Sequence, residues 1–337
     1  MSEMVRIALD AMGGDNAPGE IVKGAVQAAN EDGRIKLFFV GRQEAIAAEL
    51  EKYTYHPEQV EIVNATEVIE TGEPPVMAIR KKKESSMVKA LMMVKEGRCD
   101  AYVSAGSTGA TLVGGQILVG RIKGVERPPL APMIPTASGA SLLLDCGANV
   151  DAKPSNLVQF AKMGSVYMKN VLGIDRPTVG LLNIGAEEEK GNALVKEVFP
   201  LLEHCPDINF IGNMEPKDAL SGKADVIVSE AFAGNILLKS YEATAGILLR
   251  EVKSCMKSTL KTKIGALLIK KKLKDTLGKF DASEYGGAPL LGLNGLVVKA
   301  HGSSKAKEIH NACLQCVTFK EQRICDQIKE IIRVKDE

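Results

Sequence analysis

The sequence predicts an α/β protein in which a mostly parallel sheet is covered by helices on both faces. Two observations lead to this prediction. Short apolar runs of strand length alternate along the chain with segments whose apolar residues recur at helical spacing. Several of these runs also end in loops rich in glycine and asparagine. Strands buried on both faces are nearly continuous apolar runs, and consecutive parallel strands need a crossover that is usually a helix.

The individual elements follow from the same patterns. Strands are predicted at Val5–Asp10, Lys36–Val40, Val60–Val63, Ala101–Ser104, Ser141–Asp145, Thr178–Leu182, Ile208–Ile211, Asp225–Val228 and within Leu290–Ala300. Helices are predicted at Gly19–Asn30, Glu44–Lys52, Ser86–Glu96 and Ala193–Leu202, after Ala110 to about Val119, and from Pro154 and from Ile236 onward. The carboxyl ends of parallel strands share one edge of a sheet, where open α/β folds bind ligands. The recurring glycine loops therefore predict a binding site at that edge.

The bulk composition is that of an ordinary globular protein. A chain of 337 residues is long enough for one large α/β unit or for two lobes. We expect a single catalytic α/β/α unit over residues 1–337, from which the segment 250–280 protrudes. The formal net charge is +1, Trp is absent and aromatic residues make up 4% of the chain. This composition disfavours binding to nucleic acid, which needs basic surfaces and stacking platforms.

The cysteines indicate a reducing, cytosolic setting. There are seven, an odd number without dense spacing. Cys313 and Cys316 form one CxxC pair, but no second pair or nearby histidine completes a zinc site, so we expect packing residues and no metal. No run reaches the roughly 18 consecutive apolar residues of a membrane span. We expect a protein that is neither secreted nor membrane-spanning.

The stretch Asn183–Asn192, NIGAEEEKGN, is the strongest single candidate for a site. It joins the predicted strand Thr178–Leu182 to the predicted helix Ala193–Leu202 through a glycine-bearing turn. Such an arrangement leaves free backbone N–H groups at the N-terminus of the helix, where anions bind. Lys190 adds a mobile positive charge, and the two asparagines add amides that donate and accept. The competing interpretation is an ordinary helix start with acids in its first turn.

A second strand–loop–helix unit follows Ala101–Ser104. Its loop, Ala105–Ala110, carries two glycines and the hydroxyls of Ser107 and Thr108, which are donors suited to phosphate. The loop is neither GxGxxG nor GxxxxGK[ST], so dinucleotide and Walker-type readings are poorly supported.

Two segments are strongly basic. In Arg80–Lys83 a solvated helix face is the favoured interpretation, and docking of an acidic partner is the alternative. Arg250–Lys279 holds ten cationic side chains against two acidic ones, a net charge of +8. Its apolar residues form two helical stripes that are rotated relative to each other, which predicts two short amphipathic helices or a break near the lysines 270–272. A membrane-facing surface and a dimer-packing hairpin are equally compatible with this pattern.

Seven loops carry a resemblance to a known family. They read DAMGGD (10–15), SAGSTGA (104–110), LDCGANVDAKP (144–154), NIGAEEEKGN (183–192), FIGNMEPKD (210–218), FAGN (232–235) and YGGAPLLG (285–292). In this order, across nearly the whole chain, they resemble the bacterial phosphate acyltransferases of the PlsX family. The resemblance implies a Rossmann-like three-layer α/β/α fold related to the isocitrate and isopropylmalate dehydrogenases. It also implies a homodimer that transfers a long-chain acyl group from acyl carrier protein to inorganic phosphate, giving acyl-phosphate for phospholipid synthesis.

The same resemblance suggests which residues act. The family's active-site lysine and asparagine fall on Lys190 and Asn235. The residues expected to bind phosphate are Gly106, Ser107, Thr108, Gly109, Asn183 and Asn192. The residues expected to touch an anionic membrane surface are Leu260, Ile264, Leu267 and Leu268. The chain departs from the family pattern at Ser107, where asparagine is usual, and at Glu230–Ala231, where Asp-Gly is usual.

The chemistry implied is attack of phosphate on a thioester, which requires no cofactor. We expect a cytoplasmic enzyme associated peripherally with the inner face of the cell membrane. Three other functions stay open on the sequence: a metal-dependent, NAD-linked decarboxylating dehydrogenase, a short-chain acyltransferase using coenzyme A, and a non-catalytic membrane scaffold. The missing dinucleotide fingerprint disfavours the first of these.

Overall fold

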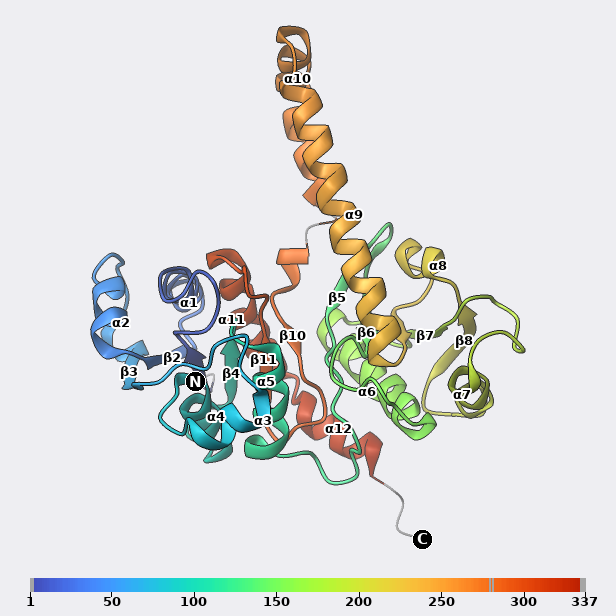
Figure 1. Cartoon of the computed structure of the whole chain (residues 1–337), viewed down its shortest axis with the longest axis horizontal. Coiled ribbons are helices and arrows are strands. Elements are labelled where there is room, and N and C mark those ends of the chain that lie inside the picture. The colour runs from blue at the N-terminus through green and yellow to red at the C-terminus, as the bar shows by residue number, and fades with distance from the viewer. Residues whose placement is uncertain (1–2, 279, 281, 334–337) are drawn as a thin grey trace. The chain divides into compact units, whose positions relative to one another are not determined.

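The computed structural model describes residues 3–278, 280 and 282–333, which fold into two compact units (Figure 1). The first unit comprises the described residues within Met1–Pro132, Lys162–Arg176 and Ser283–Glu337. The second unit comprises those within Met133–Ala161 and Pro177–Ala282. The expectation of one catalytic unit over the whole chain stays a prediction, because a catalytic unit is defined by activity and not by compactness.

The first unit is built on a six-stranded sheet. In spatial order its strands are β10 (Ala288–Pro289), β11 (Leu296–Lys299), β4 (Ala101–Ser104), β1 (Val5–Asp10), β2 (Ile35–Gly41) and β3 (Val60–Asn64). All neighbouring pairs are parallel except β10 with β11. The central strand β1 is almost fully buried, as expected for a strand with helices on both faces.

Helices cover both faces of this sheet. They are α1 (Gly19–Glu31), α2 (Gln43–Leu50), α3 (Pro75–Lys81), α4 (Ser86–Lys95), α5 (Thr108–Gly114) with its π-helical continuation Gly115–Val119, α11 (Ala306–Glu321) and α12 (Ile324–Ile332). Helices α1 and α11 pack together on one face, and α4 packs on the other (Figure 1). A 3-10 turn, Pro57–Gln59, leads into β3, and another, Ala282–Tyr285, precedes β10.

The second unit is built on a five-stranded sheet. Its spatial order is β5 (Met133–Thr136), β6 (Gly139–Leu144), β9 (Val226–Val228), β7 (Thr178–Leu182) and β8 (Asn209–Met214). Only β5 runs antiparallel to its neighbour. The helices of this unit are α7 (Ala193–Glu203), α8 (Pro216–Ser221), α9 (Ala231–Lys257) and α10 (Leu260–Gly278). Helix α6 (Pro154–Leu172) begins in this unit, and from Lys162 onward its residues belong to the first unit.

The predicted fold class is confirmed. Two mostly parallel sheets with covering helices form, and the predicted strands are found within a few residues of their expected ends. Some elements differ from the prediction. Residues 133–136 pair as the edge strand β5, where the sequence predicted no strand. Helix α9 begins at Ala231, five residues before Ile236, because the Glu230 carboxylate accepts hydrogen bonds from the first free backbone N–H groups.

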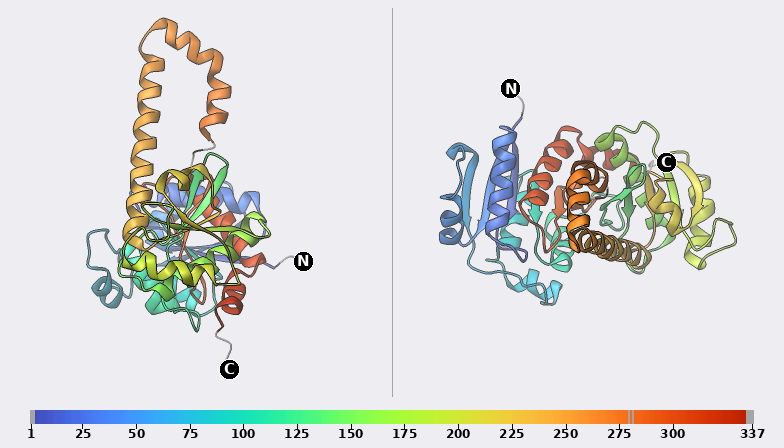
Figure 2. Two further views of the ribbon diagram at one scale, coloured as in Figure 1. Left: turned by 90° about the vertical axis from the view of Figure 1, so that its right-hand side faces the viewer. Right: turned by 90° about the horizontal axis from the view of Figure 1, so that it is seen from above.

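The basic segment forms a helical hairpin of the second unit. Helix α9 extends away from the sheet and α10 runs back beside it (Figure 2). The expected break near lysines 270–272 is wrong, since α10 continues through them. The chain reverses instead at Ser258–Thr259, where Thr259 Oγ1 accepts a hydrogen bond from Thr262 N at 3.1 Å and Thr262 Oγ1 accepts one from Thr259 N at 3.0 Å. These hydroxyls cap the start of α10 and end the preceding helix.

The apolar side chains of the hairpin lie on its surface. Leu267 is 73% exposed and Leu268 is 82% exposed, and Leu260 and Ile264 are exposed as well. Among the described helices, none combines the length with the apolar composition that crossing a bilayer requires. The hairpin thus presents apolar and cationic groups together without being a span.

The contact between α1 and α11 offers a test of the fold. A Cβ added at Gly24 of α1 would lie 2.3 Å from the backbone oxygen of Ala306. Alanine raises helix propensity, but here it must push two helices apart, and overpacking of this kind costs about 1–3 kcal/mol. We therefore expect Gly24→Ala to lower the free energy of unfolding by that amount in chemical denaturation.

Gly33→Ala is the matched control for that substitution. Gly33 has no atom within 4 Å of an added Cβ and no positive φ. It should leave stability unchanged or slightly raised. Equal stability of the two variants would contradict the close packing of α1 on α11.

Candidate active site

Four parallel strands of the second unit end at one edge of its sheet, and the predicted site loops leave from there. The order β6–β9–β7–β8 puts the loop after β9, which leads to Asn235, next to the loop after β7, which holds Lys190. Leu181 of β7 is in register with Val228 of β9. Neighbouring strands lie about 4.8 Å apart, so the two loops start side by side. Lys190 thus lies in the loop after β7, and Asn235 lies near the start of α9, the helix that follows the neighbouring strand β9.

Asn235 lies in the first turns of α9 and is half-buried. Its side-chain Nδ2 donates to the backbone oxygen of Cys146, in the loop after β6, at 2.9 Å. The two loops meet closely, since a Cβ on Gly234 would lie 1.9 Å from the backbone oxygen of Asp145. Glycine at 234 is therefore required for this approach, and the contact fixes the orientation of the Asn235 amide.

The loop Asn183–Asn192 is held together from within. Asn183 Oδ1 accepts from the N–H of Ile184 at 2.8 Å, and Asn183 Nδ2 donates to the backbone oxygen of Lys190 at 3.1 Å. Gly191 has a φ of +98°, and a Cβ there would lie 2.4 Å from Asn183 Oδ1. Asn192 caps α7 by accepting from Val195 N at 2.9 Å. Both asparagines thus shape the loop, and their contact with phosphate stays a prediction.

Lys190 projects from this braced loop and is exposed. Within the described part of the chain, its ammonium group forms no ion pair with any carboxylate. The neighbouring acids Glu187, Glu188 and Glu189 are exposed too. The backbone oxygen of Glu187 accepts from Asn213 Nδ2 at 3.0 Å, which ties this loop to the end of β8. A cation available for an incoming anion therefore stands on an anchored loop.

The side chains nearest to Asn235 that could act as nucleophiles are not available for that role. Cys146 is buried, and burial raises the pKa of its thiol well above the ordinary range, so it is protonated at neutral pH. Ser229 is buried as well, and its hydroxyl donates to the backbone oxygen of Asp145 at 3.2 Å. The arrangement therefore favours chemistry without a covalent enzyme intermediate.

The carboxylate of Asp145 closes the loop after β6. It is fully buried and accepts hydrogen bonds from the backbone N–H groups of Gly147, Ala148 and Asn149, the last at 2.7 Å. Asn149 Nδ2 also donates to it, at 2.8 Å. A protein carboxylate thus occupies the N–H groups of this loop, which leaves substrate binding to the neighbouring loops.

In the first unit, two glycine loops meet over a buried carboxylate. Asp10 ends β1 and accepts from Ser86 Oγ at 2.6 Å and from Ser104 Oγ at 2.8 Å. Ser104 Oγ in turn accepts from Gly106 N at 2.9 Å. A Cβ on Gly13 would lie 2.8 Å from that same nitrogen. Burial raises the pKa of Asp10, although the two serine hydrogen bonds lower it.

Of the predicted phosphate-binding residues, Gly106 and Ser107 lie in this first-unit loop, and Thr108 and Gly109 are the first two residues of α5. Ser107 is buried, and its hydroxyl is used as the N-cap of α5, where it accepts from Ala110 N at 3.4 Å. Thr108 is exposed. Of the two hydroxyls predicted to bind phosphate, only that of Thr108 is directly presented to solvent. Whether these residues bind phosphate stays a prediction.

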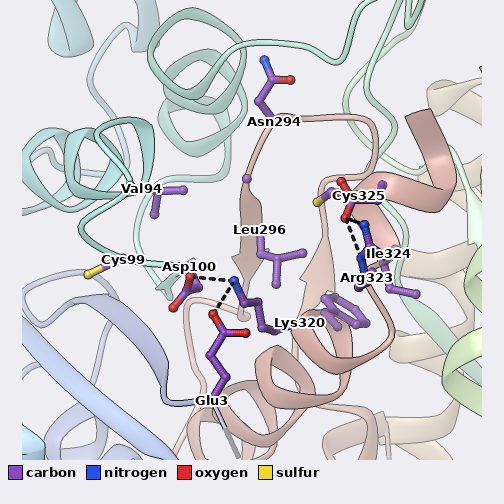
Figure 3. Close-up of a pocket in the computed structure, with 14 residues that line it drawn as sticks. Glu3, Val94, Cys99, Asp100, Asn294, Leu296, Lys320, Arg323, Ile324 and Cys325 are labelled. Carbon is purple, nitrogen blue, oxygen red and sulfur yellow. Dashed lines mark hydrogen bonds and ion pairs between the residues drawn. The ribbon is translucent and has the colours of Figure 1, made fainter. Parts of the chain in front are cut away.

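A cavity of about 380 Å³ lies at the opposite edge of the first unit's sheet (Figure 3). It is lined by residues next to the amino ends of β4 and β11, such as Cys99, Asp100 and Leu296. Lys320 reaches between Asp100, at 3.1 Å, and Glu3, at 3.6 Å, so its charge is already paired. Because the predicted loops lie at the carboxyl edge, this cavity is not the predicted site.

The cavity also lacks a reactive thiol. Burial raises the pKa of Cys99 and that of Cys325 to about 12, so both are protonated at neutral pH. Among the residues that the structure describes, there is no cluster of three or more His, Cys, Asp or Glu side chains that could hold a metal ion.

Solved structures with the same fold include phosphotransacetylases. A phosphotransacetylase from Streptococcus pyogenes matches with a TM-score of 0.61 and 20% identity, covering 94% of each chain. The EutD phosphotransacetylase from Staphylococcus aureus matches with a TM-score of 0.60 and 19% identity, again covering 94% of each chain. At these identities the likeness shows the fold. The chain is thus an α/β protein with the fold of the phosphotransacetylases.

Sequence comparison is more specific. Residues 5–327 match the family model described as fatty acid synthesis protein. The phosphate acyltransferase of Clostridium botulinum (strain Alaska E43 / Type E3) is 51% identical over 333 residues, which cover 98% of this chain and all of the relative. The chain belongs to this fatty acid synthesis family, the PlsX family of phosphate acyltransferases, as its loop motifs predicted.

Sequence reasoning missed the residues that brace the loops. Asp10 and Ser104 were predicted as strand ends and as the first residues of two loop motifs, but no bracing role was predicted for them, although a polar residue at the end of an apolar strand is a signal for such a role. Glu230 was noted as a departure from the family pattern, and the structure gives it a role as the cap of α9, with bonds of 2.6 and 2.8 Å. The capping role of Glu230 and the bracing roles of Asp10 and Ser104 depend on which groups meet in space. A single sequence does not show these contacts.

The bracing role of Ser104 is testable. Ser104→Ala removes the donor to Asp10 and the acceptor for Gly106 N, both of which are buried. Leaving buried polar groups without partners costs about 1–3 kcal/mol. We expect the free energy of unfolding, measured by chemical denaturation, to fall by that amount.

Ser303→Ala is the control, because its exposed hydroxyl contacts only the His301 ring among described residues. It should change stability by less than about 0.5 kcal/mol. A Ser104→Ala variant as stable as this control would contradict the bracing role.

Proposed function

We propose that the chain transfers a long-chain acyl group from an acyl-carrier-protein thioester to inorganic phosphate and releases acyl-phosphate. The observation that carries the proposal is the family match over residues 5–327. It is supported by the positions of Lys190, in the loop after β7, and Asn235, near the start of the helix that follows the neighbouring strand β9. In this reaction a phosphate oxygen forms a bond to the thioester carbonyl carbon. The carbon–sulfur bond then breaks, and the carrier leaves as a thiolate.

Phosphate itself serves as the nucleophile in this proposal. A phosphate dianion attacks without activation by an enzyme group, and a thiolate leaves readily, so no acyl-enzyme is needed. The buried, protonated thiol of Cys146 and the engaged hydroxyl of Ser229 support direct attack. The protein's tasks are then to hold phosphate near the carbonyl and to stabilise the tetrahedral oxyanion.

Lys190 has the charge for the first task. Its ammonium group forms no ion pair within the described residues and stands on a loop anchored by Asn183 and Asn213. We assign it to neutralising phosphate or the developing oxyanion. Asn235 orients phosphate or donates to the oxyanion, since its amide is held in place through Cys146. The proposal also gives Gly106–Gly109 of the first unit a phosphate-binding role, because these residues follow a strand, open a helix and offer backbone N–H and hydroxyl groups.

The carrier protein as acyl donor is part of the proposal. A short-chain enzyme that uses coenzyme A is the second candidate, favoured by the likeness of the fold to phosphotransacetylases. Long-chain thioesters of the carrier protein and of coenzyme A, compared under the same conditions, separate the two. We expect a higher kcat/KM for the carrier thioester, and the reverse preference would select the second candidate.

The hairpin α9–α10 suits a peripheral contact with an anionic membrane. Leu260, Ile264, Leu267 and Leu268 are exposed beside many lysines, and such surfaces bind anionic lipid through apolar insertion and charge attraction. Association with the inner face of the cell membrane would place a water-insoluble product close to its consumer. We also propose a homodimer, on the family resemblance alone.

The role of Lys190 is tested by Lys190→Ala. Loss of one group that stabilises transition-state charge typically lowers kcat by about 10²–10³-fold. We expect a loss of this size in acyl-phosphate formation, measured by trapping the product with hydroxylamine. Lys196→Ala, an exposed lysine of α7 in the same unit, should retain normal turnover. Near-normal acyl-phosphate formation by Lys190→Ala would remove the assignment.

The membrane contact is tested by Leu267→Glu and Leu268→Glu. Each change replaces an exposed apolar side chain by an anion, so it should weaken sedimentation with anionic vesicles and leave turnover in solution largely intact. Leu201→Glu alters an exposed leucine of α7, outside the hairpin, and should bind vesicles like the wild type. Unchanged sedimentation of both hairpin variants would contradict the contact.

A further inference from the structure

We propose that the exposed face of α3, together with Lys83 two residues beyond its end, is the surface on which the acidic carrier protein docks. This docking surface consists of Val76, Met77, Arg80, Lys81 and Lys83. The inference rests on the proposed function, because it assumes that the acyl donor is a protein. The carrier must be held while its thioester reacts, and the loops described above do not explain how. The inference says where on the protein the carrier is held.

The helix presents apolar and cationic groups on one face. Val76 is 44% exposed and Met77 is 47% exposed, and both are neighbours of cations one turn later, Arg80 and Lys81. Residues four apart lie on the same side of a helix. Ala78 and Ile79 are buried on the opposite side. An apolar centre with a charged rim is the arrangement found at protein–protein contacts.

The cations of this surface are available to a partner. Within the described residues, Arg80, Lys81 and Lys83 form no ion pair and donate no side-chain hydrogen bond. Lys82 and Lys89 differ from them. Lys82 pairs with Glu73 at 2.6 Å, and Lys89 pairs with Glu84 at 2.6 Å. The local acids thus neutralise the two inner lysines and leave three outer cations uncompensated.

The surface lies beside one of the predicted phosphate-binding loops. Helix α3 packs against α5, the helix that begins directly after Ser107 (Figure 1). A Cβ added at Gly109 would lie 2.7 Å from Pro75 Cγ, so the start of α3 touches this loop. A partner seated on α3 would therefore sit next to the carboxyl edge of the first unit's sheet, within reach of the loop by a flexible arm.

The size of the patch favours a protein over a membrane. Helix α3 exposes two large apolar side chains, Val76 and Met77, and the affinity of a surface helix for lipid scales with the apolar area that it buries. Clustered cations instead accelerate encounter with an oppositely charged protein, and this effect weakens with salt. The partner that the proposed reaction supplies is a carrier protein, and an acidic one complements these charges.

The test compares two charge reversals of equal size in the first unit. The docking variant is Arg80→Glu with Lys81→Glu. The control variant is Lys95→Glu with Arg98→Glu, two exposed cations that lie just before β4, at the opposite edge of the sheet. Each is assayed with a carrier-protein thioester and with a neutral N-acetylcysteamine thioester of the same acyl chain. Binding of the carrier protein alone is measured by titration.

We expect the docking variant to raise KM for the carrier thioester and Kd for the carrier at least 10-fold, with kcat little changed. Turnover of the neutral thioester should be unaffected, and the salt dependence of kcat/KM should flatten. The control variant should behave like the wild type. An unchanged KM and Kd of the docking variant overturn the inference. An equal loss of turnover with the carrier thioester and with the neutral thioester also overturns it. The same holds if the variant loses sedimentation with anionic vesicles but still binds the carrier. A wild-type chain that binds the carrier but forms no acyl-phosphate contradicts the proposed function and leaves the docking surface standing.

Discussion

Parallel pairing of the strands is the constraint on which the rest of this structure depends. Because β6, β9, β7 and β8 run in the same direction, every chain segment that leaves them does so at one edge. Residues as far apart in sequence as Asn149, Lys190 and Asn235 are gathered there without any direct bond between the last two. Reversal of one strand would carry its loop to the other edge, and a one-residue slip would move its side chains to the other face of the sheet. The direction and register of the buried strands therefore determine which residues meet at this edge.

The loops at this edge are rigid because their polar groups are used internally. Asp145 takes up the N–H groups of its own loop, Asn183 joins the two ends of the next, and Asn235 is tied to the backbone of Cys146. In the proposed function, the groups offered to phosphate at this edge are the ammonium group of Lys190 and the amide of Asn235. Preorganised groups of this kind stabilise developing charge without reorganisation. Some polar groups of these loops hold the loops in shape, and others are proposed to contact phosphate. For this reason we propose that phosphate, and not a protein side chain, is the nucleophile.

Much of this architecture could be predicted from the sequence. Apolar runs such as Val5–Asp10 and Thr178–Leu182 are unambiguous because both faces of the strand are buried, and the loop motifs identify the family. Other features depend on contacts between distant segments. The early start of α9 needs the Glu230 carboxylate to fold back onto the helix, and the start of α10 is set by capping at Thr259. The β5 strand was missed because proline obscures an edge strand whose partner is known only from the fold.

The central claim is that phosphate attacks the thioester directly. Rapid mixing of the wild-type chain with a long-chain acyl-carrier thioester, with and without orthophosphate, tests it by following the release of carrier thiol. The account predicts no thiol release stoichiometric with the protein in the absence of phosphate, and in its presence release that equals the acyl-phosphate formed. A burst of one thiol per active site without phosphate would demonstrate an acyl-enzyme and contradict the account.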